Sequence, residues 1–394
     1  MTRLWDKGAP LDARVLAYTA GDDYLLDERL VRYDVQASLA HAQMLHAQRL
    51  LSAEDLAAIS AGLTELAQTH AAGDWHIDLG DEDGQTALET RLTQKIGPAG
   101  ARIHLGRSRN DQVLTALRLY MRDATAELAA AARRVAAALD ALGEREQRTV
   151  LPGYTHMQQA MPSSVPLWAG GFAAEIRDDA VNLEGVLRRL NRNPLGSAAG
   201  YGAPNLPLDR DATTRAMSFD STQAPVTAVQ LSRGKAEAHL LFEITLLMQD
   251  LGRFAADVLL FYTQEFGFVA LPEAFTTGSS IMPQKRNPDV FELLRGRTAT
   301  AHAALDEALG IFAKLPSGYQ RDLQLLKAPL FRGIDLAMQT LDLLPAAIGA
   351  MSFRKENIRL DPSIHAAEQA YALVVRDGIP FREAYRRIAA KLKK

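Results

Sequence analysis

The segment from residue 108 to about residue 150 restricts the possible folds most strongly, because nothing in it interrupts a helix. It contains no proline, and its first glycine is Gly143. Its apolar residues recur in steps of three and four, which marks one face of a helix: Val113, Leu117, Tyr120, Ala124, Leu128, Ala131, Val135, Leu139 and Leu142. A helix of about 40 residues would be roughly 60 Å long. That length exceeds the diameter of an ordinary small domain and predicts an elongated bundle.

Four further segments show similar helical patterns, and they complete the predicted bundle. They cover about 165–190, 226–266, 289–314 and 323–351, and the second of them has weak points at Gly234 and Gly252. Strand-like alternation of β-branched residues is nearly absent. The sequence therefore predicts an all-α protein built on a bundle of long helices. We expect an N-terminal helical domain at 1–106, the long-helix bundle at 107–353, and a short C-terminal helical domain at 354–394.

Composition excludes several classes of protein and suggests self-association. The 394 residues are 47% hydrophobic and 23% charged, with a net charge of −3 and no cysteine. This charge balance does not indicate a nucleic-acid or membrane-surface protein, and disulfides and thiolate metal sites are excluded. No 18-residue apolar run and no signal-peptide core occur, so we expect no membrane span and a cytoplasmic location. Segment 124–142 is alanine-rich around most of its circumference, which favours burial on several sides and hence a homo-oligomer.

A first polar cluster, HLGRSRNDQV, precedes the longest helix. Ser108 or Asn110 could simply cap that helix, with Asp111 in its first turn. Arg109 is less expected there, since a cation and a helix N-terminus repel each other. An arginine at this position makes more sense beside an anion, which it can hold through two parallel hydrogen bonds.

A second cluster, LPGYTHMQQAMPSS at 151–164, lies between two long helices. Its prolines and glycine indicate a short irregular connection that carries Thr155, His156 and Gln158. A single histidine is most often structural. His156 nevertheless lies where backbone groups are free, so it is the histidine we would choose as a proton donor or acceptor.

A third cluster, TTGSSIMPQKRNPD at 276–289, interrupts the helices with turn-forming residues and two prolines. It could be an ordinary surface loop, or a mobile loop that presents hydroxyls, N–H groups and Lys285 to an anion. Glu292 follows in the next helix, where it could complement the helix dipole or orient an imidazole. No spacing of histidines and carboxylates indicates a metal site.

These three clusters resemble the three motif regions of the fumarase/aspartase superfamily, in the same order. GSSIMPQKRNPD is similar to the superfamily loop GSSxMPxKxNP, and GYTHMQ and SRNDQ match the other two regions. Within the superfamily, SRNDQ, YQRDLQ (319–324) and GIPFREAY (378–385) are most similar to the argininosuccinate lyase family. The likeness extends over essentially the whole chain.

The resemblance implies a reaction, an assembly and residue roles. The implied reaction is the β-elimination of argininosuccinate to arginine and fumarate, without a cofactor or metal, in a homotetramer whose active sites are shared between subunits. The resemblance implies that Ser279 is the general base and that Lys285 stabilises the intermediate. It also implies that His156 is the acid and that Glu292 is the carboxylate beside it. Substrate-binding roles are implied for Ser108, Arg109, Asn110, Thr155, Gln158, Asn287, Tyr319, Gln324 and Lys327.

Some positions depart from the family pattern, and other functions remain open. Gln85 stands where the family has a histidine, and SRGK (232–235) replaces S-D-R-D, so that Arg233 or Lys235 could substitute for the displaced arginine. The alternatives are another fumarate-releasing lyase of the adenylosuccinate lyase or aspartase type, a catalytically silent crystallin-like structural protein, and a helical interaction protein.

Overall fold

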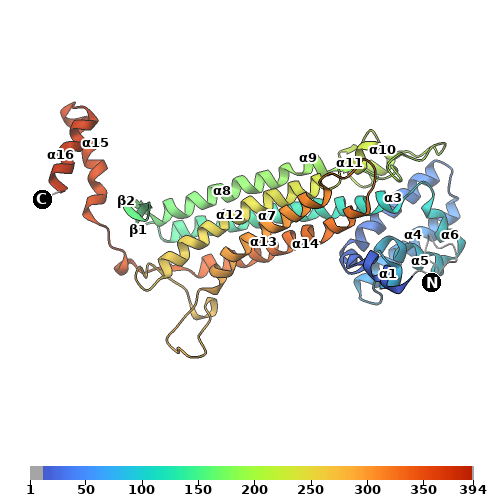
Figure 1. Cartoon of the computed structure of the whole chain (residues 1–394), viewed down its shortest axis with the longest axis horizontal. Coiled ribbons are helices and arrows are strands. Elements are labelled where there is room, and N and C mark those ends of the chain that lie inside the picture. The colour runs from blue at the N-terminus through green and yellow to red at the C-terminus, as the bar shows by residue number, and fades with distance from the viewer. Residues whose placement is uncertain (1–11, 393–394) are drawn as a thin grey trace. The chain divides into compact units, whose positions relative to one another are not determined.

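The protein is all-α, as the sequence predicts. The computed structural model describes residues 12–392. Five long helices run alongside one another (Figure 1): α7 (Arg109–Arg145), α8 (Val165–Gly185), α12 (Lys235–Tyr262), α13 (Asp289–Phe312) and α14 (Lys327–Ala350). Each lies within or close to a stretch whose apolar spacing predicts a helix.

Shorter helices precede, connect and follow the long ones. The N-terminal helices are α1 (Ala13–Ala20), α2 (Asp23–Leu26), α3 (Val31–Ala47), α4 (Ala53–Ala71), α5 (Gly84–Ile96) and α6 (Pro98–Ala101). The connecting helices are α9 (Leu187–Leu190), α10 (Arg210–Ala216) and α11 (Thr227–Leu231), and the last two are α15 (Ala366–Asp377) and α16 (Phe381–Leu392).

Strands are few and short. β1 (Val150–Thr155) and β2 (Gln158–Ser164) form an antiparallel hairpin. The pair β3 (Arg192–Asn193) and β4 (Ser221–Thr222) is parallel, and the pair β5 (Val269–Ala270) and β6 (Ser352–Phe353) is antiparallel. The sequence predicted an irregular connection at 151–164, and this was wrong. Pro152 faces Pro162 across the hairpin, and a two-stranded ribbon has free outer edges that tolerate a missing N–H.

The chain forms two compact units. The first unit comprises Met1–Glu127, Asn182–Ile244 and His302–Asp335. The second unit comprises Leu128–Val181, Thr245–Ala301 and Leu336–Lys394. Both units combine segments that are distant in the sequence, whereas the predicted domains at 1–106, 107–353 and 354–394 are continuous. That division remains a prediction.

In the first unit, helices α3, α4 and α5 enclose an apolar core that includes Leu45, Ile59, Leu63 and Leu92. Side-chain caps fix where two of these helices begin. Ser52 Oγ accepts the N–H of Asp55 at the start of α4, and Asp83 Oδ1 accepts the N–H of Thr86 at the start of α5. The second cap also fixes the position of the Asp83 carboxylate.

Two glycines in the predicted helix 226–266 behave differently, and their neighbours explain why. At Gly234 the φ angle is +83°, and a Cβ would lie 2.3 Å from the ring of Phe312. The helix therefore breaks there, and α12 starts at Lys235. Gly252, in contrast, lies within α12, and a Cβ at this position would be 2.5 Å from Thr298 Cγ2. The absence of a side chain therefore allows α12 to approach α13 closely.

In the second unit, an aromatic cluster joins α8, α12 and α13. The rings of Trp168 and Phe254 are 5.4 Å apart, and those of Phe254 and Phe291 are 6.1 Å apart. Trp168 Nε1 donates to Asp257 Oδ2 at 2.9 Å, which satisfies the half-buried indole N–H. Helices α15 and α16 form a small cluster of their own around Ala370, Ala384 and Ile388.

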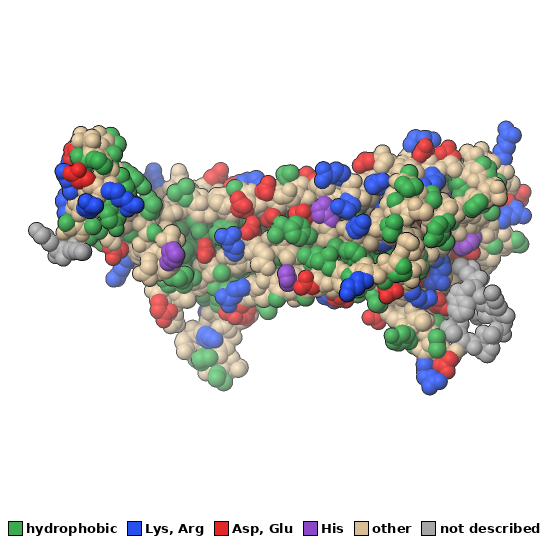
Figure 2. Space-filling model, turned by 45° about the horizontal axis from the view of Figure 1, so that its top comes forward, with side chains coloured by type: hydrophobic (Ala, Val, Ile, Leu, Met, Phe, Trp, Pro, Cys, Tyr) green, Lys and Arg blue, Asp and Glu red, His purple; other side chains and the backbone are tan. Residues whose placement is uncertain are grey.

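Several large apolar side chains of the long helices stay exposed. Charged side chains of both signs are interspersed with apolar ones on the face shown in Figure 2. The exposed apolar residues of these helices include Leu167, Val181, Phe242, Leu246, Leu293, Leu309 and Leu343. Among residues 12–392, no helix combines the length and hydropathy needed to cross a membrane.

Candidate functional site

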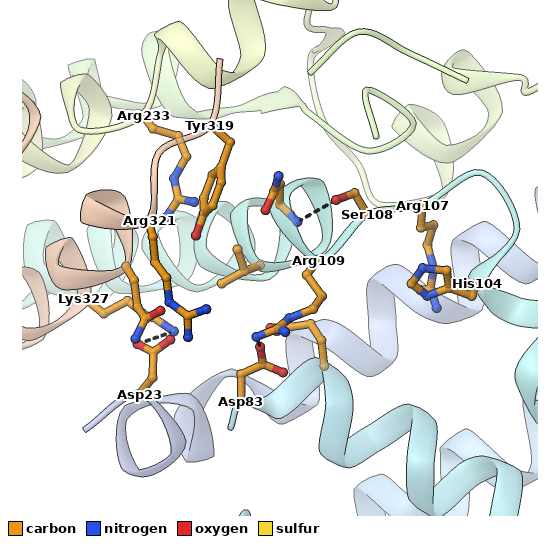
Figure 3. Close-up of a pocket in the computed structure, with 14 residues that line it drawn as sticks. Asp23, Asp83, His104, Arg107, Ser108, Arg109, Arg233, Tyr319, Arg321 and Lys327 are labelled. Atoms are coloured by element: carbon orange, nitrogen blue, oxygen red, sulfur yellow. Dashed lines mark hydrogen bonds and ion pairs between the residues drawn. The ribbon is translucent and has the colours of Figure 1, made fainter. Parts of the chain in front are cut away.

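A polar pocket of about 390 Å³ lies in the first unit, where five chain segments meet. Its walls come from α2, the start of α5, the start of α7, the turn before α12, and residues 319–327. Figure 3 shows two carboxylates, Asp23 and Asp83, among several cations around it. Its charged and polar lining residues are Asp23, Asp83, Gln85, His104, Arg107, Ser108, Arg109, Asn110, Arg233, Tyr319, Arg321, Gln324 and Lys327.

The start of α7 is held by Asp111, which is fully buried. One carboxylate oxygen accepts the N–H of Ser108 at 2.9 Å, and the other accepts the N–H groups of Gly196 and Ala198 at 2.9 and 2.8 Å. Burial raises the pKa of Asp111 to about 6, although these N–H donors act in the opposite direction. Ser108 Oγ accepts the N–H of Asn110 at 3.3 Å. The capping role of Ser108 is therefore real, and it coexists with a position on the pocket wall.

Arg109 has acidic partners within its own unit. Its guanidinium pairs with the carboxylate of Asp83 and lies 3.7 Å from Glu82 Oε2. The unexpected cation at a helix start is thus explained by two carboxylates from the loop before α5. In Figure 3, Arg109 and Asp83 point toward each other beside the pocket.

Lys327 is a buried cation between two carboxylates. Its ammonium is 2.6 Å from Asp27 Oδ1 and 2.8 Å from Asp23 Oδ1, and the side chain is 1% exposed. Burial raises the pKa of Asp23 to about 7, and Lys327 opposes that rise. Asp27 also accepts the N–H of Gly84 at 3.0 Å. This arrangement connects α2, α5 and α14 and fixes the floor of the pocket.

Two of the remaining lining residues make structural contacts of their own. Gln324 Nε2 donates to the carbonyl oxygens of Thr19 and Ala20 at 3.0 and 3.2 Å. The ring of Tyr319 lies 5.8 Å from the guanidinium carbon of Arg233.

Arg233 and Gln85 are both buried, each with 3% of its surface exposed. Arg233 Nη2 donates to Leu323 O at 3.2 Å, while its Nε and Nη1 have no hydrogen-bond partner among the described residues. The Gln85 side chain lies beside the buried Asp34 carboxylate and stabilises its charged form. A buried donor is costly when it stays unpaired, so the free nitrogens of Arg233 indicate where a ligand binds.

The second unit carries the hairpin cluster. His156 and Met157 form its two-residue turn, with φ angles of +52° and +62°. A tight hairpin turn of this kind requires positive φ at both positions, which is unfavourable for residues other than glycine or asparagine. Thr155 and Gln158 face each other at the base of the turn. All four side chains are exposed.

The loop 276–288 is anchored at its ends and exposed in its middle. Thr277 and Asn287 exchange backbone hydrogen bonds at 3.0 and 2.8 Å. Asn287 Nδ2 donates to Gly278 O at 3.3 Å. Between these anchors, Ser279 Oγ accepts the N–H groups of Ile281 and Met282 at 3.3 and 3.2 Å. Two donors aimed at one hydroxyl oxygen would also stabilise it as an alkoxide.

A shallow groove of the second unit brings part of the third cluster together. Lys285, Asn287 and Glu292 line it, along with Met157 from the hairpin turn and Arg295 from α13. Lys285 and Glu292 are exposed, and Asn287 is half-buried. Water would screen charges placed this way, so the groove needs a cover before its charges can act strongly on a substrate.

Comparison with known proteins decides the family. A family model described as "Lyase" matches residues 11–302. Argininosuccinate lyase of Sorangium cellulosum (strain So ce56) is 47% identical over 393 residues, which is 99% of this chain and 90% of that protein. Argininosuccinate lyase of Stenotrophomonas maltophilia (strain R551-3) is 43% identical over 98% of this chain and 90% of that protein. The chain belongs to the argininosuccinate lyase family.

The fold agrees with this membership. The crystal structure of EDDS lyase in complex with formate superposes with a TM-score of 0.81, covering 97% of this chain and 76% of that chain. Its sequence identity is 24%, so this likeness concerns the fold alone. As a member of the argininosuccinate lyase family, the protein is an enzyme, a lyase.

The predicted site residues of this argininosuccinate lyase family member divide into two sets. Ser108, Arg109, Asn110, Tyr319, Gln324 and Lys327 line the pocket of the first unit. Lys285, Asn287 and Glu292 line the groove of the second unit. Ser279 lies within the loop beside that groove, and Thr155, His156 and Gln158 lie at the hairpin turn. The roles assigned to all thirteen residues remain predictions.

The residue patterns alone missed Asp23 and Asp83 as parts of the pocket. For Asp23 the sequence did contain a usable signal. Asp23 and Asp27 are one helical turn apart, and a buried lysine needs carboxylates as partners. Asp83 gave no comparable signal, because its role as the cap of α5 accounts for it equally well. Among the described residues, no group of three or more His, Cys, Asp or Glu side chains could hold a metal ion.

Proposed function

We propose that this protein is an argininosuccinate lyase, which reversibly eliminates fumarate from argininosuccinate to yield arginine in arginine biosynthesis. The observation that carries the proposal is the 43–47% identity, over nearly the whole chain, to proteins named argininosuccinate lyase. The pocket of the first unit suits this substrate, because argininosuccinate carries three carboxylates, an ammonium and a guanidinium. Five cations and two carboxylates line this pocket, so it offers partners for charges of both signs on the substrate.

The proposed chemistry starts at Ser279. Its alkoxide removes a proton from the succinate carbon next to a carboxylate, and the N–H groups of residues 281 and 282 stabilise that alkoxide. The resulting carbanion is held as a dianionic carboxylate, for which Lys285 and Asn287 supply a cation and an amide donor. The C–N bond then breaks, and its electron pair leaves with the guanidino nitrogen. His156, oriented by Glu292, supplies the proton that this nitrogen takes up.

We propose a homotetramer in which subunits share active sites. Two observations support it. Ser279, Lys285 and His156 lie on exposed or half-exposed segments, although the chemistry requires exclusion of water. Apolar side chains such as Leu167 and Leu293 are 70% and 64% exposed on the long helices, which indicates that further helices cover them. A cytoplasmic location belongs to the same proposal, and cell fractionation would test it.

A direct assay tests the proposed activity. Purified protein incubated with argininosuccinate should release fumarate, which absorbs in the near ultraviolet. Adenylosuccinate, aspartate and malate should give none. Fumarate release from one of those instead would favour another lyase of the superfamily, and none from any substrate would contradict a lyase altogether.

Replacing the proposed base tests the mechanism. Ser279→Ala should lower kcat by about 10²–10⁴-fold, since that is the usual contribution of a positioned general base. The unfolding midpoint and the assembly should not change, because the side chain is on an exposed loop. Ser280→Ala, at the next position, is the matched control and should keep most of the activity. Equal activity of the two variants would exclude Ser279 as the base.

A further inference from the structure

Among the cations that line the pocket of the first unit, Arg233 has the most buried nitrogens without a hydrogen-bond partner in the described part of the chain. Lys327 is neutralised by Asp23 and Asp27, and Arg109 by Asp83. Arg321 is exposed and donates to the carbonyl oxygen of Thr19. Arg107 is buried, donates to Ser38 Oγ, and has one nitrogen, Nε, without a partner among the described residues. Arg233 forms no ion pair with any acidic side chain in residues 12–392, and its one hydrogen bond goes to a carbonyl.

The burial of Arg233 makes this lack of an acidic partner informative. The residue is 3% exposed, and its Nε and Nη1 are buried without a hydrogen-bond partner. A buried guanidinium without an ionic partner is destabilising, and a carboxylate held by two parallel hydrogen bonds would remove most of that cost. In Figure 3, Arg233 and Tyr319 lie next to each other at the pocket, with Arg321 nearby. The missing partner is therefore expected to be an anion that enters the pocket.

The local backbone selects Arg233 over the second candidate in the SRGK segment. Gly234 takes a φ of +83° and lies against the ring of Phe312, so α12 begins only at Lys235. Arg233 is consequently on the turn and lines the pocket, whereas Lys235 is exposed and is not part of the pocket wall. Of the two cations that could replace the family's displaced arginine, the geometry favours Arg233.

We propose that Arg233 is a specificity-determining residue that binds the α-carboxylate of the arginine half of the substrate. This inference rests on the proposed function. Asp23 and Asp83 line the same pocket, and although each pairs with a cation, its carboxylate can accept a further hydrogen bond from the α-ammonium group of the same amino acid. The pocket thus offers partners for both charges of an α-amino acid. A guanidinium compound without the α-carboxylate would leave Arg233 unpaired and should bind poorly.

The reverse reaction tests the assignment, because fumarate can be offered with either of two amines. Arginine carries the α-carboxylate, and agmatine is the same molecule without it. The wild-type enzyme should prefer arginine by about 100-fold or more in kcat/KM, as expected for a site built to bind a polar group that the competitor lacks. Consumption of fumarate, followed by its absorbance, gives the rate for both.

Two variants and one control complete the experiment. Arg233→Met should lower kcat/KM for arginine by about 100-fold, mainly through KM, and change the value for agmatine by less than about threefold. Arg233→Lys keeps the charge but loses the planar fork, so it should recover only part of the preference. Lys235→Met removes the same charge two residues away and should keep the wild-type preference.

Several results would overturn the assignment. If the wild-type enzyme used agmatine as well as arginine, the assignment would be wrong. This result needs no variant, so it holds even if Arg233→Met fails to fold. An unchanged preference in Arg233→Met, or a raised KM for fumarate with the preference intact, would place Arg233 elsewhere on the substrate. A wild-type enzyme that neither consumes fumarate with arginine nor releases it from argininosuccinate would instead contradict the proposed function.

Discussion

At the scale of single residues, two of the five cations in the pocket of the first unit are neutralised by carboxylates of the same chain. Lys327 and Arg109 were both predicted to bind substrate, yet each has carboxylate partners from its own chain. Such pairs position the pocket wall and fix its charge pattern before any ligand arrives. Arg233, whose Nε and Nη1 have no partner among the described residues, is therefore the cation that a ligand can satisfy most directly.

The buried carboxyl group of Asp34 should make stability depend on pH in a defined direction. Burial raises its pKa to about 6, whereas in the unfolded chain the value is about 4. Between these values the folded state binds more protons, so the free energy of unfolding contributed by Asp34 falls as pH rises. Asp34→Asn cannot ionise. Relative to wild type, its free energy of unfolding should rise by about 1 kcal/mol from pH 5 to pH 7.

Denaturant unfolding followed by tryptophan fluorescence at the two pH values would measure this difference. Asp220→Asn is the matched control, because Asp220 is exposed. Its difference from wild type should be the same at both pH values. If the Asp34→Asn difference were also independent of pH, Asp34 would not be the titrating group.

At the scale of elements, close packing of the long helices depends on small residues at their crossing points. Gly252 lies opposite Thr298, and Gly143 lies against Pro166 at the contact between α7 and α8. The hairpin between α7 and α8 is the other notable element. Its turn forces His156 and Met157 into the left-handed region, which costs of the order of 1 kcal/mol or more per residue. Strain of this kind at an exposed turn is consistent with the catalytic role proposed for His156.

Gly252→Ala should destabilise the protein although alanine is the better helix former. The new methyl group would lie 2.5 Å from Thr298 Cγ2, and threonine is stiff at χ1, so neighbouring atoms must shift. Overpacking costs about 1–3 kcal/mol, and the gain in helix propensity is about 1 kcal/mol. We expect a net loss of up to about 2 kcal/mol in denaturant unfolding. Gly310→Ala, with no atom within 4 Å of its Cβ position, should not lose stability; equal losses for both would refute the packing argument.

At the scale of the whole molecule, the predicted site residues belong to two different units. The pocket of the first unit holds the start of α7 and residues 319–327. The second unit holds the loop 276–288 and the hairpin turn, both exposed. A complete active site must bring these two sets around one substrate. We expect assembly of several chains to achieve this and to exclude water at the same time.

Mixing two inactive variants tests this arrangement. Asn110→Ala removes a pocket residue of the first unit, and Ser279→Ala removes the proposed base of the second. If a site combines the two units of different subunits, hybrids should recover about a quarter of the wild-type activity, because a quarter of the sites then contain neither substitution. The two homo-oligomers, mixed without exchange of subunits, are the control. Hybrids that stay inactive would mean that each chain supplies both residues to the same site.

The sequence alone determined the fold class, most of the positions of the long helices, and the motif residues. Apolar spacing along 108–150 sufficed for α7, because the side chains on one helix face must be buried whatever they meet. Pro288 sufficed to place the start of α13, since proline terminates a preceding structure and is compatible with a helix beginning. These features depend on neighbours within a few residues, so periodicity and turn chemistry reveal them.

Only the tertiary structure decided the features that depend on distant partners. Gly234 and Gly252 look alike in sequence, but Phe312 lies beside the first and Thr298 beside the second. The same holds for the charges: Lys327 is neutralised by residues some 300 positions earlier, whereas Arg233 has no acidic partner among residues 12–392. Local sequence carries no record of such contacts, because burial and pairing arise only when the chain has brought its segments together.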